Sequence, residues 1–248
     1  MFRATLQDIN LIKDSLESIA SMITEGSFKI DKDGIRLTAM DPASVAMVDF
    51  LILPSAFLDY SAHETYHATI NVTNFVEILK RSRANDQITL ELTENKMKVT
   101  MQGDFKRSFS IPLIDTPPSN QNVPELDFKT RVEIVAAALR DGIKDAQMVG
   151  DCVVFETKPE SFAIKSFGDT SETNMLLTKE SASLVSLDSS TEEKAKYSLD
   201  YLDKIMKGSK ISDRIVLRYG TDYPMRIDCT AVDKLRLSFI LAPRVDTD

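Results

Sequence analysis

The chain contains two histidines, and their spacing is the one arrangement in the sequence that resembles a catalytic metal site. His63 and His67 stand four residues apart in HETYH, with Glu64 beside the first. On a helix this spacing puts two imidazoles on one face, as in part of a zinc motif. The next residues, ATINV, alternate like a strand, and a third ligand is missing from the pattern. We therefore interpret HETYH as a solvated loop and keep a small metal-dependent hydrolase as a minor alternative.

Other catalytic patterns are missing from the sequence. It has no glycine-rich phosphate loop, no CxxC pair and no nucleophile elbow, and glycine occurs only eight times. Asp86 and Asp213 fall where a helix pattern gives way to a strand pattern, a place where aspartate commonly forms a turn. The sequence therefore predicts a protein without an active site, a cofactor or a bound metal.

Cationic side chains are the remaining candidates for function, and they belong to an internal repeat. LKRSRANDQITL at 79–90 returns as MKGSKISDRIVL at 206–217, with five of the twelve positions identical. Such a repeat indicates two copies of one domain. In both copies the basic residues close an amphipathic helix and precede a polar turn and a strand. The cations are therefore part of the duplicated unit.

Hydrophobic periodicity predicts the elements that position these cations. Apolar residues step by three and four over 9–23, 75–79 and 199–206, which predicts helices. Residues 88–93 alternate between apolar and polar and predict a strand. A hairpin pattern at 26–41 recurs at 150–169 with about three extra turn residues. We expect an α+β fold of two duplicated domains, each an antiparallel sheet whose apolar face is covered by two helices.

Composition and chain punctuation predict two domains and a connector. With 248 residues, of which 43% are hydrophobic, the chain can bury a core in each of two domains. The segment 112–128 is rich in proline and asparagine and cannot continue a helix or a central strand. We predict an N-terminal domain at 1–116, a connector at 117–127 and a C-terminal domain at 128–248.

The same composition restricts the compartment. No apolar run reaches membrane-spanning length, and charges interrupt the amino-terminal residues where a signal peptide needs an apolar stretch. Cys152 and Cys229 lie in strand patterns, which predicts buried thiols in a reducing compartment. We expect a protein that is neither exported nor membrane-bound. Because the net charge is −8, nucleic-acid binding requires cations gathered on one surface.

The cations of the helices allow two interpretations. Lys and Arg near a helix carboxyl terminus stabilise it by about 0.3–1 kcal/mol, so a solvated face explains them. If the helices all lie on one side of the sheets, the same cations form a basic surface that contacts phosphates without reading bases. Tyr201 is the only ring near them in the sequence, which argues against a groove that stacks single-stranded bases. The residues concerned are Lys13, Lys80, Arg81, Arg83, Arg140, Lys144, Lys204, Lys207 and Lys210.

Four further segments resemble one protein family. GIRLTAMDPASVAMVDF at 34–50, RSFSIPLID at 107–115, the connector ending in VPELDF and LAPRV at 241–245 are similar, in order, to sliding clamps of the proliferating-cell-nuclear-antigen type. PLID and LAPRV are more similar to archaeal members. The resemblance implies a non-catalytic ring of three subunits, closed head to tail around duplex DNA, with helices lining the hole. It also implies partners that bind through short peptide motifs, namely a clamp loader, a DNA polymerase, a flap nuclease and a DNA ligase.

The resemblance assigns roles to individual positions. Lys13, Lys80, Lys144 and Lys207 match DNA-facing positions, whereas Glu77 stands where some clamps carry lysine. Paired edge strands would join the subunits through Phe105, Arg107, Phe109 and Ile111 of one and Met175 and Leu177 of the next. A pocket for the aromatic anchors of client peptides corresponds to Met40, Val45, Met47, Val123, Pro224, Leu241, Ala242 and Pro243. Core packing is the plain alternative for each of these apolar residues.

The principal alternative function is an interaction scaffold, monomeric or dimeric, that uses the duplicated fold without encircling DNA. A native mass separates the two, since the clamp predicts a trimer. The clamp interpretation places an archaeal protein in the cytoplasm with the nucleoid, and a eukaryotic one in the nucleus. The sequence does not distinguish a homotrimer from a ring mixed with paralogues, because interface strands of both kinds look alike.

Overall fold

The computed structural model describes residues 1–117 and 121–245, which form two compact units. The first unit is drawn from residues 1–42, 48–123 and 231–237, and the second from 43–47, 124–230 and the segment from 238 onward. Pro118, Ser119 and Asn120 of the predicted connector lie outside the described residues. The described residues of the predicted connector, 117 and 121–127, contain no helix or strand.

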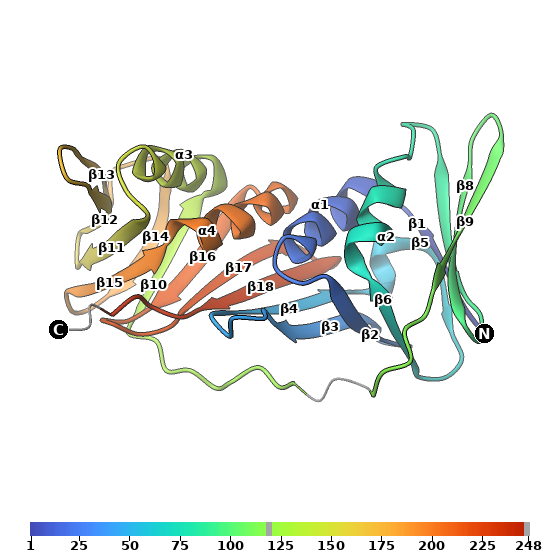
Figure 1. Cartoon of the computed structure of the whole chain (residues 1–248). Helices are drawn as coiled ribbons and strands as arrows, with labels where there is room; N and C mark the ends of the chain where they lie inside the picture. The colour runs from blue at the N-terminus through green and yellow to red at the C-terminus, as the bar shows by residue number, and fades with distance from the viewer. Residues whose placement is uncertain (118–120, 246–248) are drawn as a thin grey trace. The chain divides into compact units, whose positions relative to one another are not determined.

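The first half of the chain forms two helices and a series of antiparallel strands (Figure 1). One sheet has the order β5-β1-β7-β8-β9, and β6, β2, β3 and β4 are neighbours in a second sheet. Helices α1 and α2 pack against each other. The elements are β1 (Phe2–Leu6), α1 (Ile9–Ala20), β2 (Glu25–Asp31), β3 (Gly34–Met40), β4 (Ala46–Ile52), β5 (Phe57–Ala62), β6 (Tyr66–Asn71), α2 (Val72–Leu79), β7 (Gln87–Leu92), β8 (Lys96–Gln102) and β9 (Lys106–Pro112).

The second half repeats this plan. One sheet has the order β13-β12-β11-β15, and β14, β10, β16, β17 and β18 follow one another as hydrogen-bonded neighbours. Helices α3 and α4 pack together. The elements are β10 (Thr130–Val135), α3 (Ala136–Gln147), β11 (Cys152–Lys158), β12 (Ser161–Phe167), β13 (Glu172–Thr178), β14 (Leu184–Ser189), β15 (Glu193–Ser198), α4 (Leu199–Met206), β16 (Arg214–Tyr219), β17 (Met225–Ala231) and β18 (Leu235–Leu241).

The helices form where the periodicity predicts them. In α1 the side chains of Ile12, Leu16 and Ile19 make one buried stripe, and the Asp8 side chain caps the helix by accepting a hydrogen bond from the Asn10 amide. Asn71 caps α2 in the same way, through the amide of Asn74. A strand precedes the first helix of each half, β1 and β10, which the expected order of helix before strands did not include.

The duplication is closer in the structure than in the sequence. Helices α2 and α4 have equal lengths and begin 127 residues apart, at Val72 and Leu199. Strands β2 and β11 begin with the same offset, and a two-residue turn follows each. The prediction of about three extra turn residues in the second hairpin is therefore wrong. Equating Gly26 with Gly150 caused the error, because Gly26 lies within β2, close to Leu37, whereas Gly150 precedes β11.

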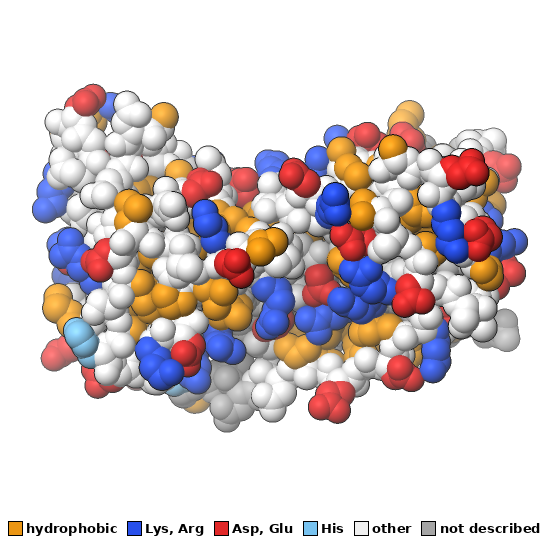
Figure 2. All heavy atoms as spheres, turned by 180° about the vertical axis from the view of Figure 1, so that it is seen from behind, with side chains coloured by type: hydrophobic (Ala, Val, Ile, Leu, Met, Phe, Trp, Pro, Cys, Tyr) orange, Lys and Arg blue, Asp and Glu red, His pale blue; other side chains and the backbone are white. Residues whose placement is uncertain are grey.

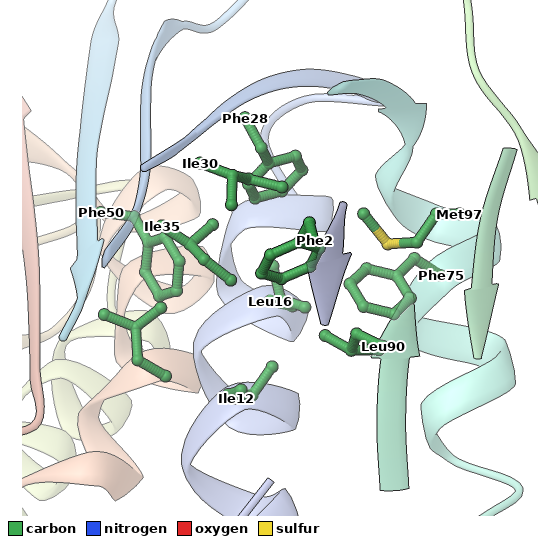
Figure 3. A pocket seen from close by; sticks show the side chains of 11 residues that line it. Phe2, Ile12, Leu16, Phe28, Ile30, Ile35, Phe50, Phe75, Leu90 and Met97 are labelled. Atoms are coloured by element: carbon green, nitrogen blue, oxygen red, sulfur yellow. The ribbon is translucent and has the colours of Figure 1, made fainter. Parts of the chain in front are cut away.

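The core of the first unit encloses a small cavity (Figure 3). Its volume is about 30 Å³, and its lining is entirely apolar, with Phe2, Leu16, Phe75 and Met97 among the side chains that point toward it. A water molecule there would find no hydrogen-bond partner. The cavity is a packing feature of the core and not a ligand site.

The two thiols differ in their surroundings. Cys229 is fully buried, and this burial raises the pKa of its thiol to about 12. Cys152 is only partly buried, at the start of β11. The prediction of buried thiols is therefore confirmed for Cys229 and wrong for Cys152, whose strand lies next to the edge strand β15.

Candidate nucleic-acid and partner interfaces

Lys80 in the first unit is held by two carboxylates. Its Nζ lies 3.0 Å from Glu77 Oε1 and 3.1 Å from Glu17 Oε1, which joins the end of α2 to α1. The hydrogen bonds to Glu77 and then Glu17 raise the pKa of Lys80, so it stays charged at neutral pH. Lys13, on α1, donates to Asn10 Oδ1 at 2.9 Å. Lys80 is therefore a cation whose charge is largely matched within the chain.

Two arginines contact one aromatic ring in the same unit. The guanidinium carbon of Arg83 is 4.8 Å from the centre of the Phe105 ring, and that of Arg107 is 5.5 Å from it. Arg107 also donates to the Arg81 carbonyl at 2.9 Å and to the Asp86 carboxylate. The sequence placed only Tyr201 near the cations, so Phe105 was missed. It was missed because the turn between β8 and β9 brings it back to Arg83 from 22 residues further along the chain.

The cations of the second unit fall into two groups. Arg140 donates to Ser209 Oγ at 3.0 Å, and Lys204 pairs with Asp200 at 2.6 Å while lying 5.0 Å from the centre of the Tyr201 ring. The second group is exposed and lies at helix ends; it consists of Lys144 in the last turn of α3, Lys207 at the carboxyl cap of α4, and Lys210 in the following 3₁₀ turn. Because α3 and α4 pack together, both groups belong to one helical layer.

Charges of both signs are mixed on the surface. On the face drawn in Figure 2, Lys and Arg side chains alternate with Asp and Glu over much of the chain. A surface of this kind contacts phosphates weakly, because neighbouring carboxylates offset part of each cation's attraction.

Strands β9 and β13 occupy equivalent edges of their sheets. Each has one sheet neighbour, β8 and β12 respectively, and the same alternation of exposed and less exposed side chains along its length. Phe109 and Met175 are half-buried in the middle of these strands. Ile111 and Leu177, by contrast, are 1% and 7% exposed and pack into the core of their own units. The part of these two residues in a subunit contact stays a prediction, in which their backbone rather than their side chains would meet the neighbouring strand.

The positions assigned to a client pocket divide in a similar way. In the second unit the Ala242 amide donates to the Val45 carbonyl at 2.9 Å, so these two distant segments lie side by side. Leu241 and Met47 are 0% and 7% exposed in the single chain, and their assignment to the pocket stays a prediction. The remaining positions are partly exposed, namely Val45, Pro224, Ala242 and Pro243 in the second unit and Met40 and Val123 in the first.

The two histidines do not share a helix. His63 lies in the turn before β6, where its Nε2 is 3.3 Å from Ser61 Oγ, and His67 lies on β6 itself. Among the described residues, no group of three or more metal-ligating side chains comes together. None of the helices that the structure describes is long and apolar enough to cross a membrane.

Comparison with known proteins identifies the family. Residues 1–111 match the model of the N-terminal domain of proliferating cell nuclear antigen, and residues 122–244 match that of its C-terminal domain. The chain belongs to the proliferating cell nuclear antigen family. The chain is 36% identical to DNA polymerase sliding clamp 1 of Thermococcus kodakarensis over 94% of both proteins. It is 35% identical to the sliding clamp of Nanoarchaeum equitans over 98% of this chain and all of the relative.

The fold agrees with this assignment. The crystal structure of the antigen from Thermococcus kodakaraensis superposes with a TM-score of 0.93 at 27% identity, covering 98% of this chain and all of that one. Two predictions from the sequence are thereby confirmed. The chain belongs to this family, and it has an α+β fold of two duplicated domains.

Proposed function

We propose that the chain is a DNA polymerase sliding clamp, a ring of three copies that encircles duplex DNA and tethers replication and repair enzymes to it. The observation that carries the proposal is the similarity to archaeal sliding clamps over nearly the whole of both chains. A protein of this kind acts by holding partners together, and it performs no chemistry of its own. In an archaeal cell it would be found in the cytoplasm with the nucleoid.

The edge strands support ring formation. An unpaired edge offers a row of backbone amides and carbonyls for pairing with another chain. β9 of one copy can pair with β13 of the next, and with one edge of each kind per chain such contacts run head to tail and close into a ring. Phe109 and Met175 would meet across this contact. Lys106 on β9 and Glu172 on β13 are exposed and opposite in charge, which suits a contact between strands of these two kinds.

The helix cations support weak, sequence-independent contact with DNA. Lys144, Lys207 and Lys210 are exposed at helix ends, where a lysine reaches a phosphate as a point charge and reads no base. A ring stays on DNA by topology, so contacts weak enough to permit sliding suffice. Lys13, Lys80, Arg81, Arg83, Arg140 and Lys204 would add to the same surface, although Lys80 and Lys204 are partly neutralised by carboxylates.

A client pocket completes the proposal. Val45, Pro224, Ala242 and Pro243 are partly exposed, and Met40 and Val123 of the first unit are the further candidates. Apolar side chains of this kind take up the aromatic anchors of a short peptide. The partners proposed for this pocket are a clamp loader, a DNA polymerase, a flap nuclease and a DNA ligase.

The test measures the native mass of the chain and its retention on circular compared with linear DNA. The chain expressed alone should run as a trimer, three times its mass of 27.7 kDa. Loaded onto a nicked circular plasmid, the ring should remain through a wash in high salt and should leave when the plasmid is cut once. A stable monomer or dimer, or release that is the same from circular and linear DNA, would support the non-encircling scaffold instead.

A further inference from the structure

A hollow of about 270 Å³ lies on the first unit where strands β2, β3 and β6 face the connector. Each strand lines it with a hydroxyl side chain, namely Ser27 on β2, Thr38 on β3 and Thr69 on β6. Met40, one of the candidates for the client pocket, lines the same hollow at the end of β3. A peptide anchored at Met40 would therefore continue into this hollow.

The segment that leads into the connector forms a fixed wall of the hollow. The Ile114 amide donates to the Thr69 carbonyl at 2.8 Å, and the Thr116 hydroxyl donates to that of Thr69 at 2.9 Å. These bonds hold the segment to the edge strand β6, and Thr116 and Pro117 line the hollow. An incoming peptide would meet a preformed wall, so that little free energy would be lost in ordering the protein.

The end of the hollow beside Met40 is acidic. β2 begins at Glu25 and β3 ends at Met40, and because these strands are antiparallel the two residues lie at the same end. Glu25 is exposed, and it is the only charged side chain among the described residues that line the hollow. No residue in the described part of the chain forms an ion pair with it.

The opposite end is basic. Two positions beyond each hydroxyl, on the same face of its strand, stands an exposed basic side chain: Lys29 on β2, Arg36 on β3 and His67 on β6. These three residues form one row across the sheet, because Lys29 is opposite Arg36 in the register of β2 with β3 and opposite His67 in that of β2 with β6.

Arg36 is the cation of this row whose charge is not matched. Lys29 Nζ lies 3.4 Å from the Asp31 carboxylate, which offsets its charge. On the neighbouring strand β4, the Asp49 carboxylate is matched by Arg236 at 3.2 Å. Arg36 forms no ion pair with any residue that the structure describes. The face therefore carries an unmatched carboxylate at one end and an unmatched guanidinium at the other.

The separation of the two charges matches an extended peptide. Glu25 and Lys29 are four residues apart on β2, or about 13 Å, and Arg36 lies opposite Lys29. A peptide that runs along the strands spans this distance in four residues, with a basic side chain at the Glu25 end and an acidic one at the Arg36 end. A polymer with charges of one sign fits only one end. Nucleic acid and a wholly acidic peptide would both be repelled by Glu25.

We propose that this hollow selects client peptides whose flank carries a basic residue near the aromatic anchors and an acidic residue about four positions further on. The inference rests on the proposed client pocket and adds a determinant of client specificity to it. Glu25 and Arg36 are the residues that distinguish the order of the two charges. Peptides of equal net charge therefore bind differently when this order is reversed.

The experiment compares labelled peptides that have one composition and two orders of charge. Each contains two adjacent phenylalanines and a Ser-rich flank with one Lys and one Glu four positions apart, and either the Lys or the Glu is nearer the phenylalanines. The flank follows the phenylalanines in one pair of peptides and precedes them in a second pair, and a flank of Ser alone is the reference. In one pair, the Lys-near peptide should bind the full-length chain about five- to twentyfold more tightly in low salt, and this ratio should fall as salt is added.

A chain with exchanged charges tests the two residues at constant net charge. Glu25→Lys with Arg36→Glu should reverse the preference, so that the Glu-near peptide binds more tightly, and a purely structural role of these residues cannot produce a reversal. The control is Glu94→Lys with Lys96→Glu, which makes the same exchange at exposed positions in and beside the turn between β7 and β8 and should keep the original preference. Native mass and thermal unfolding of each variant check that the fold is intact. If the doubly changed chain fails to fold, Arg36→Gln alone should lower the ratio of the two affinities about threefold.

Each other result has a definite meaning. Equal binding of the two orders, or a preference that the exchanged chain retains, would overturn the inference and leave the client pocket standing. Loss of the preference in the control variant would also overturn it, and so would tighter binding of a flank of Glu alone than of the Lys-near flank. Failure of the Ser-flanked peptides to bind at all would overturn the client pocket itself, and this inference with it.

Discussion

Removing the two carboxylates that hold Lys80 should strengthen DNA binding. In the structure, Lys80 Nζ lies 3.0 Å from Glu77 and 3.1 Å from Glu17, so two of the three ammonium donors are used within the chain and the charge is offset before it meets a phosphate. Glu77→Gln and Glu17→Gln, singly and together, keep side-chain size and hydrogen-bonding capacity while removing the charge. Lys80 would then be available to DNA, and two carboxylates that repel phosphate would be lost.

The exposure of the groups sets the magnitude. Exposed ion pairs contribute about 0.2–1 kcal/mol each, and since the Lys80 side chain is 43% exposed we take about 0.5 kcal/mol for each of its two pairs. The double variant should therefore gain about 1 kcal/mol, or about fivefold in affinity. The plot of log affinity against log salt should steepen by about 0.9 for each additional phosphate that the protein neutralises.

The assay is equilibrium binding of the chain to short duplex DNA over a series of salt concentrations. Glu94→Gln, at an exposed position in the turn between β7 and β8, is the control for net charge and should change affinity little. Lys80→Ala and Lys207→Ala complete the set. Since Lys207 is exposed at its helix end, its loss should cost more affinity than the loss of Lys80.

Two results would refute the reasoning. Unchanged affinity and slope in Glu17→Gln with Glu77→Gln would mean that the carboxylates do not restrain Lys80 or that Lys80 faces away from DNA. Equal losses in Lys80→Ala and Lys207→Ala would mean that intramolecular pairing does not govern which lysines contact DNA. A native mass for each variant ensures that only intact assemblies are compared.

Three further predictions address the pocket, the ring contact and pH stability. Val45→Asp should weaken binding of a phenylalanine-anchored peptide by about 2 kcal/mol or more in a titration while native mass stays that of the trimer; loss of the trimer would instead make Val45 a core residue. Phe109→Asp with Met175→Asp should yield a folded monomer at micromolar concentration by native mass, because both half-buried side chains lie on edge strands; a persistent trimer would contradict this contact. Glu193→Gln should lower the free energy of unfolding at neutral pH by about 1–3 kcal/mol in denaturant titrations, because the hydrogen bonds from Thr221 favour the carboxylate and lower its pKa. Because the pKa of Glu193 is lower in the folded state, this stabilisation is present above the usual Glu value of 4.5 and is lost as pH falls through the folded-state pKa. The difference in unfolding free energy between the original chain and Glu193→Gln should therefore shrink in acid. A difference that stays constant with pH would refute the ionic origin.

The candidate site contains differences in exposure that the sequence pattern did not predict. Leu241, Met47, Ile111 and Leu177 have the same apolar character as their neighbours in the sequence, yet they are buried in their own units. Val45, Phe109 and Met175 remain partly exposed. A strand pattern predicts alternation of faces but not which face the rest of the unit covers, because that depends on packing between segments far apart in the chain.

Most of the charge pairs could not be predicted from the sequence either. Lys80 forms an ion pair with Glu17, which is 63 positions away in the sequence. The hairpin turn between β8 and β9 brings the Phe105 ring into contact with Arg83 and Arg107. Of these contacts, only the helix-spaced pair of Lys80 with Glu77 could have been found from spacing.

By itself the sequence determined the duplication, the positions of most of the helices and the family. These follow from periodicity and local motifs, which operate within one element or repeat at fixed offsets along the chain. Only the tertiary structure decided that Glu17 also pairs with Lys80 and which apolar side chains stay exposed. Each of these depends on distances between residues remote in sequence, and these distances exist only after the sheets and helices have packed.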